Sequence, residues 1–251
     1  MRAWRDRPDI IAPLRRIAVS STPQRPRTHP ASVIAIDGPA ASGKSVVGTT
    51  VAARLGYHFY DTGAMYRAVT WLALRRGLDP TDAVRLVELA DSVTLTVCEG
   101  TAGTIEPTTV LLDGDDATPH LRDAAVDASV SLVSRVPGVR EALVRLQREL
   151  AAGGRVVMAG RDIGSVVLPD ADLKVYLDAS REVRARRRAE QMRESGLPAD
   201  VEALVADLAR RDGIDSSRAT SPLTAAPGAV IIRTDDLTLA EVVQRILNLA
   251  E

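Results

Sequence analysis

An eight-residue glycine-rich loop, Gly38-Pro-Ala-Ala-Ser-Gly-Lys44-Ser45, constrains the fold of this chain more than any other segment. It matches the pattern G-x-x-x-x-G-K-[ST] at every fixed position. It also follows an apolar, β-branched run, Val33–Asp37, and precedes a stretch with helical character. In such a loop the glycines let backbone amides turn inward around a phosphate, and the amino terminus of the helix adds partial positive charge. The motif therefore predicts a site for a nucleoside triphosphate but leaves the phosphate acceptor open.

The side chains of this loop have separate expected roles. Lys44 is placed to reach the β- and γ-phosphates, and the Ser45 hydroxyl is placed to bind Mg²⁺. Asp61, which follows the second predicted strand, either holds a water bound to the metal or caps the helix that begins at Thr62. The residues expected to bind ATP from this segment are Gly38, Pro39, Ala40, Ala41, Ser42, Gly43, Lys44, Ser45 and Val46.

Composition excludes several broad classes of protein. The net charge is −1 and only 3% of the residues are aromatic, which disfavours bulk binding to nucleic acid. No run approaches the roughly 20 uncharged apolar residues of a membrane span, and the single cysteine, Cys98, cannot form an intramolecular disulfide. The secreted, membrane and general nucleic-acid-binding classes are therefore disfavoured. We expect a cytoplasmic monomer whose partners are small molecules, not nucleic acid or a membrane.

Lysine is scarce in this chain, and its scarcity excludes some classes of phosphate-loop protein. Lys44 and Lys174 are the only lysines among 32 basic residues, so a single arginine is weak evidence for function. Neither lysine follows an asparagine, which excludes the Asn-Lys-x-Asp motif of regulatory GTPases. The signatures of transporter ATPases and of protein kinases are also missing. What remains is phosphoryl transfer to a small molecule.

Strand-like and helix-like segments alternate along most of the chain, which predicts an α/β fold with a parallel sheet covered by helices. Five core strands are expected, at Val33–Asp37, Tyr57–Tyr60, Val156–Ala159, Leu173–Leu177 and Val230–Arg233. Helices are expected at 45–55, 62–76, 82–90, about 121–133, 138–152, 180–194, 200–212 and 238–249. Two alternating segments, Val93–Cys98 and Thr109–Leu112, predict a small antiparallel insert near 92–135.

Residues 1–31 differ from the rest of the chain, with five prolines, many arginines and no sustained periodicity. Their one apolar stretch is too short and too broken by proline for a secretory signal, whereas a mitochondrial presequence is less easily dismissed. We expect a disordered tail, or an upstream choice of start codon, followed by one domain over 32–251.

Three further groups of residues follow the glycine-rich loop in order. They are Asp61-Thr-Gly-Ala-Met-Tyr-Arg67, then Gly160-Arg-Asp162 with the adjoining Ile-Gly-Ser-Val-Val-Leu-Pro-Asp170, and then Arg211-Asp-x-x-Asp215-x-x-Arg218. Together with the loop they resemble the cytidylate kinase family from about Val33 to the C-terminus. The resemblance implies the P-loop nucleoside-monophosphate-kinase fold, and transfer of the ATP γ-phosphate to CMP or dCMP with Mg²⁺. Two alternatives stay open, namely a kinase for another acceptor such as AMP, UMP or shikimate, and a non-catalytic nucleotide-binding regulator.

The resemblance also assigns residues to the acceptor. By similarity, Asp162 with Ser131 and Arg140 recognises cytosine, whose amino donor and two acceptors complement a carboxylate and a guanidinium. By similarity, Asp215 binds a sugar hydroxyl. The other residues expected at the acceptor are Thr62, Arg67, Arg211 and Arg218. Gly138 stands where the family usually has a further arginine, and Ile214 where some relatives have one, so neither is given a role.

Position along the chain gives independent support for part of this assignment. Thr62 and Arg67 follow one predicted strand, and Arg161 and Asp162 follow another, so both pairs are expected at the carboxyl edge where open α/β sheets bind ligands. Each arginine also has a plain structural explanation, as a surface residue or as half of an ion pair.

A cluster of arginines over 184–188 precedes Gly196 and Pro198, and this arrangement predicts a lid over about 184–200 that folds over the triphosphate. Arg184 and Arg187 are expected to bind ATP. Lys44, Arg161 and Arg188 are expected to act on the transferred phosphoryl group. In a chain so rich in arginine, a solvated helix face is the simpler explanation of the cluster.

Overall fold

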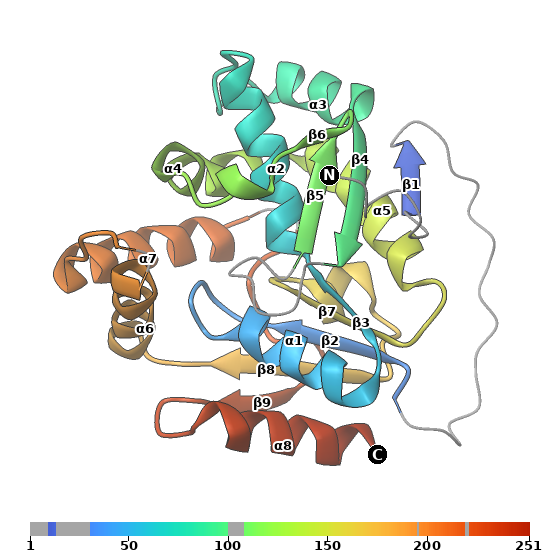
Figure 1. Cartoon of the computed structure of the whole chain (residues 1–251), viewed down its shortest axis with the longest axis vertical. Coiled ribbons are helices and arrows are strands. Elements are labelled where there is room, and N and C mark those ends of the chain that lie inside the picture. Colours follow the sequence, from blue (N-terminus) through green and yellow to red (C-terminus); the bar gives the residue numbers. More distant parts are fainter. Residues whose placement is uncertain (1–9, 14–30, 100–107, 195, 219–220) are drawn as a thin grey trace. The chain divides into compact units, whose positions relative to one another are not determined.

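Five short strands form a parallel sheet in the computed structural model of this chain, which describes residues 10–13, 31–99, 108–194, 196–218 and 221–251. Their order across the sheet is β3-β7-β2-β8-β9, and every neighbouring pair is parallel (Figure 1). The strands are β2 (Val33–Asp37), β3 (His58–Asp61), β7 (Val156–Gly160), β8 (Leu173–Asp178) and β9 (Val230–Arg233). All five match predicted strands, and the parallel arrangement brings their carboxyl ends to one edge.

The chain folds into two compact units. Of the described residues, those within 31–61 and 153–251 form the sheet unit, and those within 10–13 and 62–152 form the insert unit. The insert unit is larger than the antiparallel insert predicted near 92–135.

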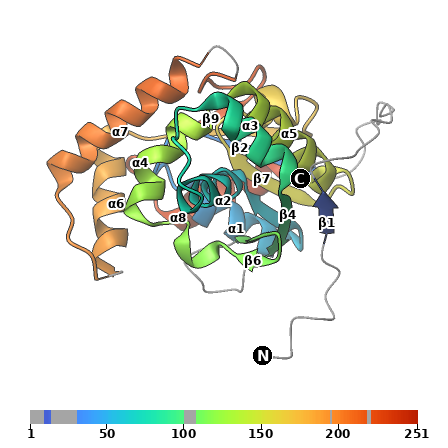
Figure 2. The same cartoon turned by 90° about the horizontal axis from the view of Figure 1, so that it is seen from above.

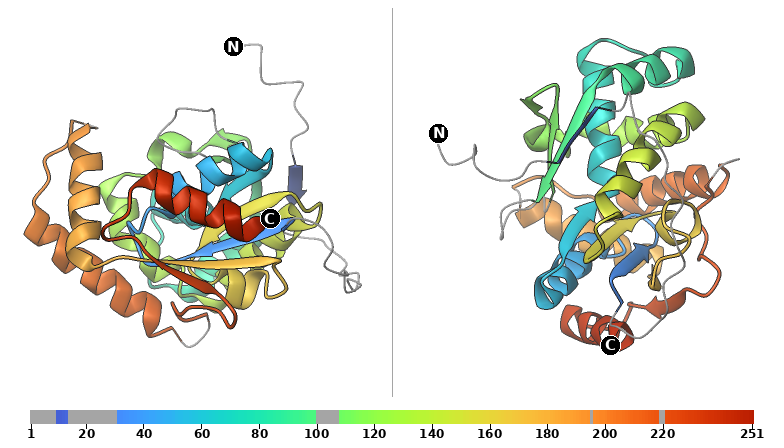
Figure 3. Two further views of the ribbon diagram at one scale, coloured as in Figure 1. Left: turned by 90° about the horizontal axis from the view of Figure 1, so that it is seen from below. Right: turned by 90° about the vertical axis from the view of Figure 1, so that its right-hand side faces the viewer.

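Two helices of the sheet unit, α1 (Lys44–Leu55) and α8 (Leu239–Ala250), pack side by side on one face of the sheet (Figure 3). Their apolar side chains share one core cluster with the strands, in which Ile34, Val51, Val157 and Ile246 are buried completely. The Thr238 hydroxyl accepts from the Glu241 amide and the Glu241 carboxylate accepts from the Thr238 amide, so α8 begins with a capping box.

The helices α6 (Arg181–Glu194) and α7 (Val201–Ser216) pack against each other in the same unit (Figure 2). A small apolar cluster of Ala40, Ala185 and Leu208 joins them to the glycine-rich loop. A single π-turn, η2 (Ile163–Val167), follows β7 and contacts β2. The sequence did not predict this turn, because one irregular turn leaves no periodic pattern of apolar residues.

In the insert unit, an antiparallel sheet is accompanied by helices. Its strand order is β1-β4-β5-β6, with β1 (Ile10–Pro13), β4 (Thr94–Glu99), β5 (Thr108–Leu112) and β6 (Asp115–Asp116). The helices are α2 (Thr62–Arg75), α3 (Ala83–Ser92), α4 (Ala124–Val133), α5 (Pro137–Ala151) and the 3-10 turn η1 (Thr118–His120). Because α2 packs on α4 and α3 packs on α5, the helices before and after the predicted insert belong to the same unit.

Strand β1 lies inside the segment that we predicted to be a disordered tail. The backbone of Ile10–Pro13 pairs antiparallel with β4, in register from Ile10 with Val97 to Pro13 with Thr94. The physical reason is that β4 has β5 on one side only, and its other edge offers unpaired amides and carbonyls to a short apolar run. Residues 1–9 and 14–30, which make up most of the predicted tail, lie outside the described residues.

Gly138 has a packing reason that the sequence did not reveal. A Cβ atom at this position of α5 would lie 2.6 Å from Cγ2 of Val87 on α3, so any larger residue would push the two helices apart.

Within the described part of the chain, no helix is both long and apolar enough to cross a membrane.

Gly48 permits a similarly close approach of α1 to β3, and this generates a stability prediction. A Cβ atom at Gly48 would lie 2.3 Å from Cε2 of the buried Phe59 ring, whereas one at Gly213 of α7 would meet nothing within 4 Å. Gly48→Ala should therefore lower the free energy of unfolding by about 1–3 kcal/mol. Gly213→Ala should raise it by up to about 1 kcal/mol, since alanine is the better helix former. Thermal unfolding of both variants tests this, and equal shifts would contradict it.

Candidate active site

The glycine-rich loop leaves β2 by a turn that only glycine fits. Gly38 has φ +152°, and a Cβ atom there would lie 2.3 Å from the Leu177 carbonyl oxygen of β8. Gly43, with φ +92°, immediately precedes the first residue of α1 and has no side chain to cap the helix. The two glycines of the loop therefore bring its backbone close to β8 and leave the first turn of α1 without a side-chain cap. A phosphate-binding loop requires both features.

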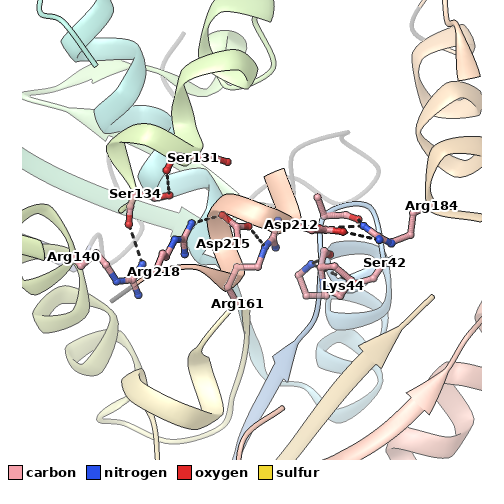
Figure 4. Close-up of polar contacts among 12 residues, drawn as sticks. Ser42, Lys44, Ser131, Ser134, Arg140, Arg161, Arg184, Asp212, Asp215 and Arg218 are labelled. Atoms are coloured by element: carbon pink, nitrogen blue, oxygen red, sulfur yellow. Dashed lines mark hydrogen bonds and ion pairs between the residues drawn. The ribbon is translucent and has the colours of Figure 1, made fainter. Parts of the chain in front are cut away.

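Lys44 is buried at the start of α1. Its Nζ donates to the Pro39 carbonyl at 2.7 Å and lies 3.5 Å from the Ser42 hydroxyl (Figure 4). Burial lowers the pKa of Lys44 well below its ordinary value, and the positive charge of Arg161 adds to this effect, while nearby carboxylates led by that of Asp61 oppose it. The ammonium group is thus held against the loop backbone, largely removed from water.

Ser45 and Asp61 meet at the carboxyl edge of the sheet. The Ser45 hydroxyl donates to Oδ2 of Asp61 at 2.5 Å. A hydroxyl and a carboxylate are hard oxygen ligands of the kind that Mg²⁺ takes together with phosphates and waters, so this pair fits the predicted metal site. No group of three or more His, Cys, Asp or Glu side chains in the described residues is arranged to hold a metal ion without such additional ligands.

Asp37, the last residue of β2, is a buried carboxylate that the sequence analysis did not single out. Its two oxygens accept from the amides of Ile163 and Gly164, at 2.7 and 2.8 Å. Burial raises the pKa of Asp37 to about 6, and these two hydrogen bonds offset part of that rise. Asp37 therefore joins the glycine-rich loop to the turn that follows Arg161 and Asp162.

Asp215 of α7 organises two of the predicted arginines. Its Oδ2 accepts from Nε of Arg161 at 3.0 Å, and its Oδ1 accepts a very short hydrogen bond from Nη2 of Arg218 (Figure 4). The side chains of Asp215 and Arg218 are almost fully buried, while that of Arg161 is about one-fifth exposed at 22%. The carboxylate therefore holds the two guanidinium groups on either side of it. Arg211 and Asp162 are also buried in this unit.

The three lid arginines with predicted roles have different surroundings. Arg184 is buried and pairs with Asp212 of α7. Arg187 donates to the hydroxyl and the carbonyl of Thr234, which follows β9, at 3.0 and 2.6 Å. Arg188 donates to the Gln191 amide oxygen at 2.8 Å. The predicted roles of these arginines in binding ATP and acting on the phosphoryl group stay predictions.

The insert unit brings together the other predicted acceptor residues. Arg67 of α2 is buried and donates to Oδ1 of Asp127 at 2.5 Å and to the Leu121 carbonyl at 3.1 Å. Ser131 lies one turn after Asp127 on α4 and is also buried. Thr62, likewise buried, is the first residue of α2.

Arg140 of α5 completes this group. It is buried, its guanidinium lies 5.5 Å from the centre of the Tyr66 ring, and its Nη1 donates to the Ser134 carbonyl at 3.2 Å. The Ser134 hydroxyl in turn donates to the Ser131 carbonyl (Figure 4). Arg140 and Ser131 are thus linked through Ser134, and their predicted role in binding cytosine stays a prediction.

A model of the family described as cytidylate kinase matches residues 34–251, which is most of the chain. The chain belongs to the cytidylate kinase family. A cytidylate kinase from Geobacillus kaustophilus is 50% identical over 216 residues, which cover 86% of this chain and 95% of the relative. A cytidylate kinase from Mycolicibacterium paratuberculosis is 49% identical over 218 residues, with coverage of 86% and 94%.

Another relative is the bifunctional pantoate ligase/cytidylate kinase of Synechococcus sp. (strain JA-3-3Ab), 46% identical over 242 residues. The match covers 96% of this chain but only 45% of that relative, so the chain spans less than half of the bifunctional protein. Among solved structures, a shikimate kinase from Bacteroides thetaiotaomicron aligns with a TM-score of 0.44 at 16% identity, over 86% of this chain and 96% of that one.

Three carboxylates of these sites were missed by the sequence analysis. Asp37, Asp127 and Asp212 each bind a backbone amide or an arginine at a predicted site. For Asp37 a signal was present, since an acidic residue at the end of an apolar strand is unusual in a sheet covered on its faces. For Asp127 and Asp212 no local signal exists, because their arginine partners are 60 and 28 residues away in the sequence.

The raised pKa of Asp37 predicts how stability depends on pH. A folded-state pKa of about 6, against an ordinary 3.8, means that the folded chain binds this proton more tightly than the unfolded chain does. The stabilisation is present at low pH and is lost as pH rises through about 6. The free energy of unfolding of the wild type minus that of Asp37→Asn should therefore fall by about 2 kcal/mol between pH 4.5 and 7.5. Urea titrations at several pH values test this, and a difference that rises with pH would contradict it.

Proposed function

We propose that this chain transfers the γ-phosphate of ATP to CMP or dCMP and releases ADP and CDP or dCDP. The observation that supports this most directly is the juxtaposition of two features in the sheet unit of a cytidylate kinase family member. One is a phosphate loop with Lys44 buried against its backbone, and the other is the cluster of Arg161, Asp215 and Arg218. AMP, UMP or shikimate as acceptor, and a non-catalytic regulator, are not favoured by the family.

The phosphate loop and its lysine bind the donor. The amides of the loop and the amino terminus of α1 contact the β- and γ-phosphates, and Lys44 neutralises charge on the phosphoryl group during transfer. The burial of Lys44 strengthens this interaction, since little water has to reorganise around the ammonium. Mg²⁺, when bound at Ser45 with Asp61 nearby, supplies charge neutralisation on the phosphates.

Arg161 and Arg188 are the further groups proposed to stabilise the transferred phosphoryl group. Arg161 is held by Asp215, so its guanidinium is already oriented before substrates bind, and little rotamer freedom is lost on binding. Arg211 of α7 and Arg218, two residues beyond its end, would bind the acceptor phosphate. No covalent nucleophile is required, because positioning and charge neutralisation account for phosphoryl transfer.

Recognition of the base is assigned to Asp162, together with Ser131 and Arg140. Asp162 is buried just after the end of β7. If its carboxylate were removed, a cytosine amino group opposite it would lose a hydrogen bond without access to water. Asp215 is assigned to a sugar hydroxyl, and Thr62 and Arg67 to the acceptor. A lid over about 184–200, cytoplasmic location and a monomeric state are further parts of this proposal.

An acceptor panel tests the activity. ADP release should be fast with CMP or dCMP and slow with UMP, AMP and shikimate. Lys44→Ala should lower kcat for CMP by about 10²–10⁴-fold, because the charge that stabilises the transition state is removed. Circular dichroism serves as the folding control. Normal turnover of the folded Lys44→Ala protein would show that the loop does not have this role.

Replacement of Asp162 tests recognition of the base. Asp162→Asn should lower kcat/KM for CMP about 10- to 100-fold, as expected for a lost buried hydrogen bond of about 1–3 kcal/mol. The CMP-to-UMP ratio should also fall, because an amide can donate to the uracil carbonyl that a carboxylate repels. Asp170→Asn is the matched control, since Asp170 is exposed in the same connection between β7 and β8. A uniform loss with both acceptors would mean that Asp162 orients Arg161 or the metal instead.

A further inference from the structure

Arg184, near the start of α6, has a protein acceptor for each of its three guanidinium nitrogens. Its Nε donates to the Ala179 carbonyl at 3.0 Å, and its Nη1 donates to the Ala40 carbonyl at 3.2 Å. Nη1 and Nη2 also donate to the two carboxylate oxygens of Asp212, at 3.3 and 2.8 Å (Figure 4). The Arg184 side chain is only 4% exposed. These contacts occupy the edge of the guanidinium that would otherwise bind a phosphate in the same two-pronged manner.

The three acceptors belong to three different parts of the sheet unit. Ala40 lies in the phosphate loop, Ala179 lies between β8 and α6, and Asp212 lies on α7. The planar guanidinium therefore fixes the distance between the loop and α7. The apolar contact of Ala40 with Ala185 and Leu208 reinforces the same junction.

Helix α7 also carries Arg211, which is proposed for the acceptor phosphate, and Asp215, which is proposed for the sugar. Asp212 is adjacent to Arg211 in sequence, and Asp215 follows three residues later, so a rotation of α7 that moves Asp212 also moves both neighbours. The ion pair of Arg184 and Asp212 thus connects the donor loop to the acceptor-binding side chains by a buried, two-pronged contact.

We propose that Asp212 is a positioning residue for phosphoryl transfer, and that Arg184 acts on the phosphate loop through the Ala40 carbonyl and on α7 through Asp212. In this role Arg184 does not contact the triphosphate. The inference rests on the proposed function, since it concerns the alignment of the ATP site with the acceptor site.

Direct binding of the triphosphate by Arg184 predicts a different change in the KM for ATP. If Arg184 bound the triphosphate directly, Asp212 would compete with the phosphates for the guanidinium. Removal of the carboxylate charge would then lower the KM for ATP or leave it unchanged. If Asp212 positions the loop and α7, removal of its charge loosens the junction and raises the KM for ATP.

Asp212→Asn is the variant that separates the two roles. We expect the KM for ATP to rise at least fivefold and kcat to fall about tenfold. Asp207→Asn is the matched control, because Asp207 lies on the same helix in an exposed ion pair with Arg210 at 2.6 Å. Its kinetic constants should stay within twofold of the wild type, as expected for an exposed pair. An unchanged or lower KM for ATP in Asp212→Asn overturns the proposal.

A double-mutant cycle with Arg184→Lys tests whether the two residues act as one unit. Lysine keeps the charge, but its single nitrogen cannot reproduce the planar fork that spans these three acceptors. Arg184→Lys should therefore resemble Asp212→Asn, and the double variant should be no worse than either single variant. Additive losses would overturn the proposal. A purely structural role would lower the melting temperature without a change in the KM for ATP, and this outcome also overturns it.

Two further measurements keep the test decisive. If Asp212→Asn does not fold, Asp212→Glu is the substitute variant. It keeps the charge at a shifted distance and should raise the KM for ATP by a smaller factor; no rise overturns the proposal.

Calorimetric dissociation constants for ATP can be measured even if the wild type fails to phosphorylate CMP. In that case the proposed function falls, while a weaker ATP complex of Asp212→Asn, but not of Asp207→Asn, would still support the positioning role. Equal ATP affinities of the two variants would exclude it.

Discussion

Lys44 and Asp37 are both buried where β2 turns into α1, so their charges have to be balanced by protein groups instead of water. Asp37 binds the backbone amides that follow Asp162, and Lys44 binds the carbonyl of Pro39. These contacts determine where the phosphate loop and the turn after β7 lie relative to each other. The rest of the sheet-unit site is built on that junction, because Arg161 enters from the same turn.

Ion pairs with carboxylates hold several arginines of this chain in defined positions. Arg67 pairs with Asp127 in the insert unit. In the sheet unit, Asp215 binds Arg161 and Arg218, and Asp212 binds Arg184. A buried guanidinium with a carboxylate partner has one orientation, whereas an exposed one on a helix samples many. Arg67 and Arg218 are two of the residues expected at the acceptor, Arg161 is expected at the transferred phosphoryl group, and Arg184 was expected to bind ATP; these roles stay predictions.

The parallel sheet could be predicted from local sequence patterns, whereas the short edge strand β1 and the π-turn η2 could not. Short β-branched runs between helical stretches predicted the five parallel strands, since periodicity and burial leave a direct trace in the sequence. The pairing of Ile10–Pro13 with β4 and the π-turn after β7 were missed. A four-residue edge strand and a single turn are too short for a repeat, so their geometry depends on the partner that they meet.

The sequence by itself determined the phosphate loop, the strands and helices on either side of it, and the residue types available for a phosphoryl-transfer site. These depend on local chemistry, such as the need for glycine where Gly38 passes the Leu177 carbonyl. Only the tertiary structure decided which charged groups are partners. Arg161 and Asp215 are 54 residues apart, and Arg184 and Asp212 are 28 apart, so no spacing rule connects them. Burial selects these pairs, because a charge removed from water has to find its counter-charge wherever the fold brings one near.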